Sequence, residues 1–525
     1  MIVLPVIKYL FKIIIYQSKF LYLIYIKIVT NNFVDLLITN TAKESNNELM
    51  NTQNKIKDTK NFVIFQLGSY PWQSPKEATS GSGILHEAQH EVFNMMDGVA
   101  SYSIFPSGFA RQKNSELNRN DVRIYEMDSE VPEYSHPDGH RWGGVGQEYV
   151  NKFISDHEKL VYDYMLEIEN SFEAGSEIKL FIAHNTAINS IIAKKVMKRR
   201  AENGLSVPPI VIFLHGTAMI MMKNELRETE LVKSGKMLES DRIWPSTFHK
   251  QLTELGVFDD CNKPGNANLA YAISEENMEV FSELFPKFDK TKFILANPGF
   301  NSCFVPQPEM KLQDVLKKAK LRHLGLSKEN TFDLRTDYKH MIVFVGQFVG
   351  WKRIDAVLRA AKIWEAEFGD KLLTLIIGKQ KKEYNIELQT LNENLGNKNT
   401  FFVGPLMQPE LADLFAAADV CTFPSKAEPF GMVLIEALAC GTPVVGANSG
   451  GPKDFMTEEV GFLVPETDDK QVFSENLAKA VIKAIKEDWK TKMSKKCVEV
   501  AAPFSNFIKT KTLLEDTKKL LGGLE

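Results

Sequence analysis

The stretch "DVCTFPSKAEPFGMVLIEALACGTPVV", residues 419–445, decides the fold. An apolar run at 419–423 predicts a buried strand, and a loop follows it. A helix is expected from about Gly431 to Cys440, because Gly441 is a suitable C-cap and a second apolar run begins soon after it. Continuous apolar strands that alternate with helices are typical of parallel sheets covered on both faces.

The same alternation occurs in two series along the chain. The first series of candidate strands comprises residues 62–67, 122–127, 178–184, 210–214, 269–273 and 292–296. The second comprises residues 341–345, 371–377, 400–403, 419–423, 443–447 and 461–465. We therefore expect an α/β protein with two Rossmann-like, doubly wound parallel-sheet domains facing a cleft. Ligands of such sheets bind beyond the carboxyl ends of the strands, so residues directly after strands are candidate site residues.

Shifts in composition predict where the domains begin and end. We expect a leader and polar linker at 1–60, an amino-terminal domain at 61–306, a linker at 307–339, a carboxy-terminal domain at 340–500 and a terminal helix at 501–525 that packs back on the amino-terminal domain. A content of 44% hydrophobic and 25% charged residues is typical of a globular protein. The net charge of −4 gives no electrostatic basis for a nucleic-acid partner. The five cysteines form no C-x-x-C pair, which favours a reducing, cytoplasmic location.

The leader differs from the rest of the chain. The only charged residues of 2–29 are four lysines, and the uncharged runs are much shorter than the roughly 20 residues that a membrane span needs. On a helical wheel the lysines gather on one side, so one interpretation is a basic amphipathic helix that makes peripheral membrane contact. The alternative interpretation is an unstructured leader or a gene-model artefact.

Two carboxylates in the opening stretch require a partner. Glu428 lies in the loop after a strand, and Glu436 lies eight positions later inside an apolar helix. A carboxylate accepts two hydrogen bonds from a vicinal diol such as that of a ribose. The first N–H groups of the helix have no intrahelical acceptor and form a site for an anion such as a diphosphate. Taken alone, the spacing favours a surface glutamate together with a structural ion pair.

The wider segment "KAEPFGMVLIEALACGTPVVGANSGGPKDFM", residues 426–456, closely resembles the donor site of retaining nucleotide-sugar glycosyltransferases of family 4, also called glycosyl transferases group 1. Enzymes of this family have the two-domain GT-B fold. The resemblance extends back over "VGPLMQPELADLFAAADV", residues 403–420, where the family places the nucleotide base. It is strong over about residues 340–470 and weaker over 61–306.

The resemblance implies roles for individual residues of this segment. Glu436 would bind the ribose hydroxyls, and Glu428 would act at the transferred sugar near its reacting carbon. Donor-binding groups, mostly backbone amides, are implied at Phe430, Gly431, Met432, Val433 and Leu434.

A second motif, "VGQFVGWKRID" at residues 345–355, ends another strand. It does not satisfy the phosphate-loop pattern G-x-x-x-x-G-K-[ST], since Arg353 stands where Ser or Thr is required. The family has an Arg and a Lys on the donor diphosphate, and Gln347 and Lys352 stand at those two positions. The resemblance therefore implies one leaving-group cation, Lys352, with Gln347 beside it.

The amino-terminal domain contributes three further candidates. "TSGSG", residues 79–83, opens a helix, and the resemblance implies that Gly81, Ser82 and Gly83 reach the donor phosphates. His215 directly follows the strand at 210–214, where a family histidine contacts the transferred sugar. His184 and Asn185 follow another strand, and either one is a candidate to face the acceptor.

Two segments point to other roles. "HEAQH", residues 86–90, matches the helical zinc-protease pattern, in which His86 and His90 would bind zinc and Glu87 would act as base. Its extended form fails, and a third ligand would have to be a distant residue such as Glu116. The segment "HPDGHRWGGVGQ", residues 136–147, is expected to be a long loop, either part of the acceptor site or a surface loop.

The sequence thus predicts a retaining hexosyltransferase that uses a nucleoside-diphosphate sugar, UDP-glucose-like or GDP-mannose-like. Its acceptor would be a sugar, a lipid-linked sugar or a small molecule. Catalysis by positioning and by electrostatic stabilisation of the diphosphate needs no cofactor and no metal. The alternatives are a GT-B sugar-nucleotide epimerase and, second, a zinc hydrolase that uses the HEAQH segment.

Overall fold

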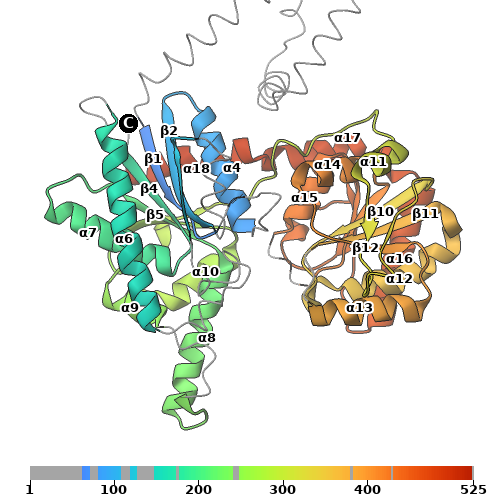
Figure 1. The fold of residues 1–525 in the computed structure, drawn as a ribbon, viewed down its shortest axis with the longest axis horizontal. Helices are drawn as coiled ribbons and strands as arrows, with labels where there is room; N and C mark the ends of the chain where they lie inside the picture. The colour runs from blue at the N-terminus through green and yellow to red at the C-terminus, as the bar shows by residue number, and fades with distance from the viewer. Residues whose placement is uncertain are drawn as a thin grey trace, which may run out of the picture. The chain divides into compact units, whose positions relative to one another are not determined.

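A computed structural model describes residues 62–70, 72, 81–107, 119–126, 147–172, 177–239, 247–378, 382–426, 428 and 430–522. The leader, Glu116 and the segment 136–146 lie outside the described residues. Two parallel sheets with helices on both faces form the described chain (Figure 1). The prediction of two doubly wound α/β domains is confirmed. Residues 61–525 form one compact unit.

The first sheet has seven parallel strands in the order β3-β2-β1-β4-β5-β6-β7. Its strands are β1 (Phe62–Leu67), β2 (Val99–Ser107), β3 (Val122–Glu126), β4 (Ile178–His184), β5 (Ile210–Leu214), β6 (Ala267–Ala272) and β7 (Phe293–Leu295). All the strands predicted here are present with ends within two residues of the expected ones. Strand β2 was not predicted.

The side chains of the central strands alternate between two apolar layers. One layer packs on α6 (Gln147–Asn170), α7 (Ile188–Glu202), α8 (Gly216–Lys233), α9 (Phe248–Glu254) and α10 (Glu275–Leu284). The opposite layer packs on α4 (Gly81–Met95) and on α18 (Asn506–Leu521), the last helix of the chain. In Figure 1 the red α18 lies beside the blue α4, and Leu513 and Leu514 of α18 are buried in this layer.

The second sheet has six parallel strands in the order β12-β11-β10-β13-β14-β15. They are β10 (His340–Val345), β11 (Leu372–Ile377), β12 (Thr400–Val403), β13 (Val420–Phe423), β14 (Val444–Ala447) and β15 (Gly461–Val464). One face is covered by α12 (Ile354–Phe368), α13 (Lys382–Leu395) and α16 (Lys470–Lys486). The other is covered by α11 (Leu312–Ala319), α14 (Gln408–Ala417), α15 (Met432–Ala439) and α17 (Trp489–Ala501).

The segment between the two sheets packs on the second one. Phe304, Leu312 and Tyr338 belong to its apolar core, and a two-stranded antiparallel ribbon, β8 (Arg322–His323) and β9 (Phe332–Asp333), bonds to Phe402 of β12. The segment after α17, including a short 3-10 turn (Ala502–Phe504), returns to the first domain. There the Phe300 and Asn506 backbones are hydrogen-bonded.

Strand β2 was missed because one of its faces is polar. Ser101 and Ser103 alternate with Ala100, Tyr102 and Ile104, so the run is not continuously apolar. Both serines are fully buried, and their hydroxyls bond to polar side chains of β1 and α4. Among the described residues, no helix is both long enough and apolar enough to cross a membrane.

Candidate functional site

Three loops meet at the carboxyl edge of the second sheet. The loop after β10 contains a 3-10 turn (Gly350–Lys352), and its Trp351 carbonyl accepts a hydrogen bond from the Lys426 amide at 2.8 Å. The Glu428 carbonyl in the loop after β13 accepts one from the Gly451 amide, also at 2.8 Å. These backbone bonds hold the three predicted donor-site loops side by side.

Lys352 and Glu428 form an ion pair at this edge. Lys352 Nζ lies 2.6 Å from Glu428 Oε2, and each side chain is only 14% exposed. The ammonium group also lies 4.1 Å from the centre of the Trp351 ring, a cation–π contact. The structure therefore brings together the predicted leaving-group cation and the carboxylate predicted to act at the sugar.

Helix α15 begins where the loop turns sharply at Gly431. Gly431 is the N-cap with φ of 96°, a left-handed conformation that favours glycine. The Leu434 amide donates to the Gly431 carbonyl at 3.0 Å, whereas no described residue accepts from the amides of Met432 and Val433. Within the described residues, two of the predicted anion-binding amides thus have no acceptor, whereas that of Leu434 is already used within the helix.

Phe430 anchors this turn through its side chain. Its ring is buried against Phe455 at 5.8 Å and Phe504 at 5.7 Å between centroids, and those two rings also contact each other. Because the ring faces the core, only the Phe430 backbone is available to a ligand.

Glu436 lies one turn further along α15, four residues after Met432. The residue is 7% exposed, and burial raises the pKa of its carboxyl group to about 8. No described residue forms a hydrogen bond or ion pair with this carboxyl group. A buried carboxyl group without a protein partner is suited to a ligand that supplies donors.

The loop after β10 places its other polar residues differently. Gln347 is exposed. Arg353, in a left-handed conformation, binds Glu466 through both terminal nitrogens, at 3.1 and 2.7 Å, and lies over the Phe473 ring. Arg353 is therefore held by residues of the domain itself, and Lys352 is the cation of this loop that lies at Glu428.

In the first domain, His215 follows β5 and is the N-cap of α8. It is 9% exposed, and burial lowers the pKa of its imidazole to about 4, so the ring is neutral at pH 7. His184, at the end of the neighbouring strand β4, is buried, with its ring inside the domain, while Asn185 beside it is partly exposed. Of these two acceptor-site candidates, only Asn185 is partly exposed. Gly81, Ser82 and Gly83 form the first turn of α4.

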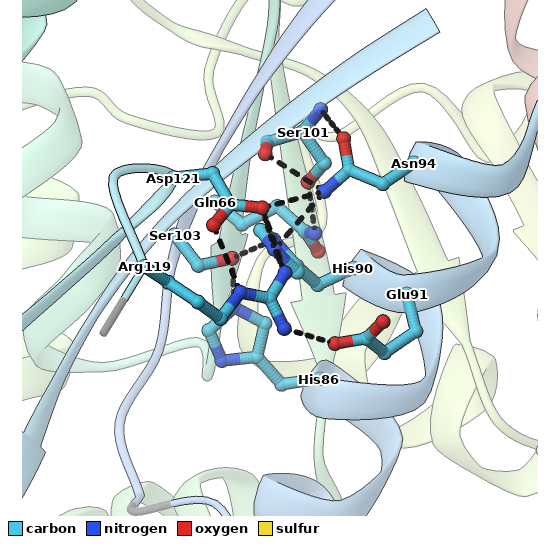
Figure 2. A network of polar contacts seen from close by, with 9 residues as sticks. All are labelled: Gln66, His86, His90, Glu91, Asn94, Ser101, Ser103, Arg119 and Asp121. Carbon is cyan, nitrogen blue, oxygen red and sulfur yellow. Dashed lines mark hydrogen bonds and ion pairs between the residues drawn. The ribbon is translucent and has the colours of Figure 1, made fainter. Parts of the chain in front are cut away.

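The two histidines of the HEAQH segment belong to a buried hydrogen-bond network (Figure 2). His86 Nδ1 accepts a hydrogen bond from Trp72 Nε1 at 3.2 Å, and His86 Nε2 lies 3.0 Å from Ser103 Oγ. His90 Nδ1 lies 2.8 Å from the same hydroxyl, and His90 Nε2 lies 3.1 Å from Asp121 Oδ2. All four ring nitrogens thus have protein partners.

Arg119 completes this network at its outer end. Its Nε and Nη2 atoms donate to the two oxygens of Asp121 at 2.8 and 2.7 Å, and it also binds Glu91. Burial alone would raise the pKa of Asp121, but the hydrogen bonds from Arg119 and His90 hold it well below its ordinary value. Within the described part of the chain, no group of three or more metal-ligating side chains gathers. The histidines of the HEAQH segment are therefore held by hydrogen bonds to other side chains of the domain.

Several of these polar residues were not identified from the sequence. Gln66, Ser101 and Ser103 lie in strands with no recognisable motif, and Arg119 and Asp121 precede a strand as ordinary surface-type residues. One signal of this polar network was present in the sequence. A glutamine lies in the apolar run of β1, and a buried amide requires hydrogen-bond partners.

Comparisons with known proteins agree with this arrangement. Residues 328–502 match the family described as Glycosyl transferases group 1. The chain is 39% identical over 133 residues to a D-inositol 3-phosphate glycosyltransferase of Kribbella flavida, covering 24% of this chain and 31% of that protein. It is 32% identical over 192 residues to a protein of the same name from Thermobispora bispora, covering 35% and 41%. The matched part therefore spans less than half of each relative.

Solved structures share the fold over most of the chain. A glycosyltransferase from Rickettsia africae has a TM-score of 0.58 at 16% identity, covering 88% of this chain and 99% of its own. HepE of Anabaena, in complex with UDP and glucose, has a TM-score of 0.54 at 15% identity, covering 87% and 100%. The prediction of the GT-B fold is confirmed, and residues 328–502 match the predicted enzyme family, glycosyl transferases group 1.

Proposed function

We propose that the protein is a retaining glycosyltransferase that uses a nucleoside-diphosphate sugar, because residues 328–502 match the family described as Glycosyl transferases group 1. The hexosyl group would pass to a hydroxyl of an acceptor. The observation that carries this proposal is the Lys352–Glu428 pair beside the N-terminus of α15. A cation and unused helix amides at one sheet edge suit a diphosphate leaving group.

The donor would be bound by three groups of the second domain. The diphosphate would lie on Lys352 and on the amides of Met432 and Val433. The ribose diol would donate to Glu436, whose carboxyl group lacks a described partner. Glu428 and the Phe430 and Gly431 backbone would contact the transferred sugar.

In the reaction, the bond between the sugar C1 and the diphosphate oxygen breaks, and its electron pair remains on the diphosphate. The acceptor oxygen bonds to C1 on the same face, and its proton passes to the departing diphosphate. Lys352 and the α15 amides stabilise the charge that grows on that leaving group. These groups supply the stabilisation without a metal ion.

The identity of the sugar and acceptor is a separate question. HepE of Anabaena was solved with UDP and glucose, which supports a UDP-sugar as the first donor to test. The inositol phosphate in the names of the curated relatives is a candidate acceptor, but those matches cover only 24% and 35% of this chain.

A thermal-shift titration tests the donor site directly, since a ligand of the folded state raises the melting temperature. Wild-type protein should be stabilised by one class among UDP-, GDP- and ADP-sugars. Lys352→Met should lose most of that shift, and Lys496→Met, at an exposed lysine of α17, should keep it. Absence of a shift with every nucleotide sugar would contradict the proposal.

Product analysis then separates the two enzyme classes that share such a site. A new glycoside with the donor's anomeric configuration is expected on incubation with donor and candidate acceptors. An epimerised sugar nucleotide, formed with no acceptor present, would instead identify a sugar-nucleotide epimerase.

A further inference from the structure

A row of buried polar side chains crosses four neighbouring strands of the first sheet. Gln66 Nε2 of β1 donates to Ser101 Oγ of β2 at 2.8 Å, and Gln66 Oε1 lies 3.1 Å from His184 Nε2 of β4. His184 Nδ1 in turn lies 3.4 Å from His215 Nε2, directly after β5. The four residues lie on the sheet face that α4 covers, and the row ends at the carboxyl edge.

The row has a direction that follows from its chemistry. A carbonyl oxygen only accepts hydrogen bonds, so His184 must carry its proton on Nε2 to bond to Gln66 Oε1. The pKa values of both histidines are lowered by burial, so each ring carries a single proton. His184 Nδ1 is then a lone pair, and His215 must carry its proton on Nε2 to donate to it. The remaining nitrogen, His215 Nδ1, is an acceptor.

Ring packing keeps His215 in this orientation. Its ring stacks on Phe213 at 4.8 Å between centroids with an interplanar angle of 14°. It meets the His184 ring edge to edge, with centroids 5.7 Å apart and an angle of 21°. Phe213 also stacks on His184, at 5.3 Å and 7°. The Phe213 ring thus packs against both imidazoles. No described residue is bonded to His215 Nδ1, so this lone pair is left for a ligand.

We propose that Gln66 and His184 are positioning residues that fix His215 as a hydrogen-bond acceptor at the site. This inference rests on the proposed function, which makes the transferred sugar the ligand. A neutral acceptor nitrogen binds a hydroxyl group and repels the lone pairs of a carboxylate. The transferred group at this position is therefore a neutral sugar with a hydroxyl, and donors with a carboxylate there are rejected.

The tautomer can be measured without any assay of activity. Nitrogen-15 NMR of histidine-labelled full-length protein distinguishes the protonated nitrogen from the bare one, and the spectrum of His215→Gln identifies the His215 signals. In the wild type we expect His215 protonated on Nε2. In His184→Leu the acceptor is gone, and we expect signals of the Nδ1-protonated form to appear.

A conservative variant distinguishes loss of the hydrogen bond from simple misfolding. In His184→Asn the side-chain oxygen takes the place of Nδ1 and can only accept, so His215 should keep its proton on Nε2. Gln66→Leu should disturb the tautomer as His184→Leu does, while Gln89→Leu, at a buried glutamine of α4 outside the row, should not. A wild-type His215 protonated on Nδ1, or one whose tautomer is unchanged in both leucine variants of the row, overturns the proposal.

Measurements of activity provide a second test of the proposal. His184→Leu should lower kcat/KM for the neutral donor by roughly tenfold, the worth of one hydrogen bond, and His184→Asn should restore most of it. The wild type should accept UDP-glucose over UDP-glucuronate, and acceptance of both equally would overturn the selectivity. If the tautomers behave as expected but His215→Gln turns over donor like the wild type, the role of His215 in the proposed function fails and the positioning by His184 holds.

Discussion

Lys352 and Glu428 lie 76 residues apart in the chain and are joined by an ion pair of 2.6 Å at the carboxyl edge of the second sheet. Each group thus neutralises the charge of the other. Under the proposed function, an arriving diphosphate would compete with Glu428 for the ammonium group. The carboxylate would then become available for the sugar as the cation engages the leaving group.

The first prediction concerns this pair. Lys352→Met should lower kcat and raise the donor KM, because the diphosphate charge is present on binding and grows on departure. Glu428→Gln keeps the shape but removes the charge near the reacting carbon, so it should lower kcat more than it raises KM. Steady-state kinetics of both variants and of the double variant measure the coupling. Strictly additive effects would show that the two groups act separately.

The second prediction concerns the protonation of Glu436. Its pKa of about 8 in the folded protein means that it keeps a proton that the unfolded chain loses above about pH 4.5. The stability that the protonated carboxyl group contributes to the folded protein is therefore fully present below pH 4.5 and is lost as the pH rises toward 8. Glu436→Gln has no group that titrates in this way. The free energy of unfolding of this variant, relative to that of the wild type, should therefore grow by at most about 1.4 kcal/mol per pH unit in that window. Urea unfolding at several pH values measures it.

The same carboxyl group makes donor binding depend on pH, which is the third prediction. Two ribose hydroxyls donate best to the ionised form, so donor affinity should rise by up to about tenfold per pH unit up to pH 8. Glu436→Gln should bind roughly tenfold to a hundredfold more weakly at pH 8 and show no such rise. Calorimetry in two buffers of different ionisation enthalpy reports the released proton. Glu466→Gln, which removes the Arg353 partner, is the control and should titrate like the wild type.

The fourth prediction tests the loop contact at Gly450. A Cβ atom there would lie 2.1 Å from the Glu428 carbonyl oxygen, and the residue has φ of 70°. Gly450→Ala should therefore displace the Glu428 loop and weaken donor binding. Gly204→Ala has nearly the same φ, 68°, but meets no atom within 4 Å, so it reports backbone strain alone, about 1–2 kcal/mol. Equal donor affinity in the two variants would show that the loop contact is unimportant.

The fifth prediction concerns the HEAQH segment. Ser103→Ala removes the hydroxyl that both buried histidines contact, so it should destabilise the protein by about 1–3 kcal/mol. Ser282→Ala, which loses only a bond within α10, should cost less. The purified protein should contain no stoichiometric zinc, and EDTA should leave transfer intact. One zinc per chain, lost on His86→Ala, would support the hydrolase alternative instead.

Particular elements show which parts of the fold can be predicted from the sequence and which cannot. The strands of the second sheet were predicted because buried parallel strands are continuous apolar runs, whereas β2 was not, since Ser101 and Ser103 interrupt it. The ends of α15 followed from Gly431 and Gly441, which local backbone chemistry requires.

Contacts between distant residues were beyond such reasoning. Neither the pairing of Lys352 with Glu428 nor that of His184 with His215 leaves a trace in local sequence, because both depend on which strands are neighbours in a sheet. The HEAQH segment shows the same limit. Its spacing places two histidines on one helix face, but the residues opposite that face decide whether they bind metal or protein.

The position of α18 has a consequence for how the polypeptide folds as it is made. Leu513 and Leu514 close an apolar layer of the first domain, and Thr517 bonds to Tyr271 of β6. A ribosome adding 5–20 residues per second needs roughly 10–40 s to travel from the end of β7 to the start of this helix. During that interval the first domain exposes an uncovered apolar face. A chaperone that shields nascent chains is thus expected to associate with this protein until α18 has been synthesised.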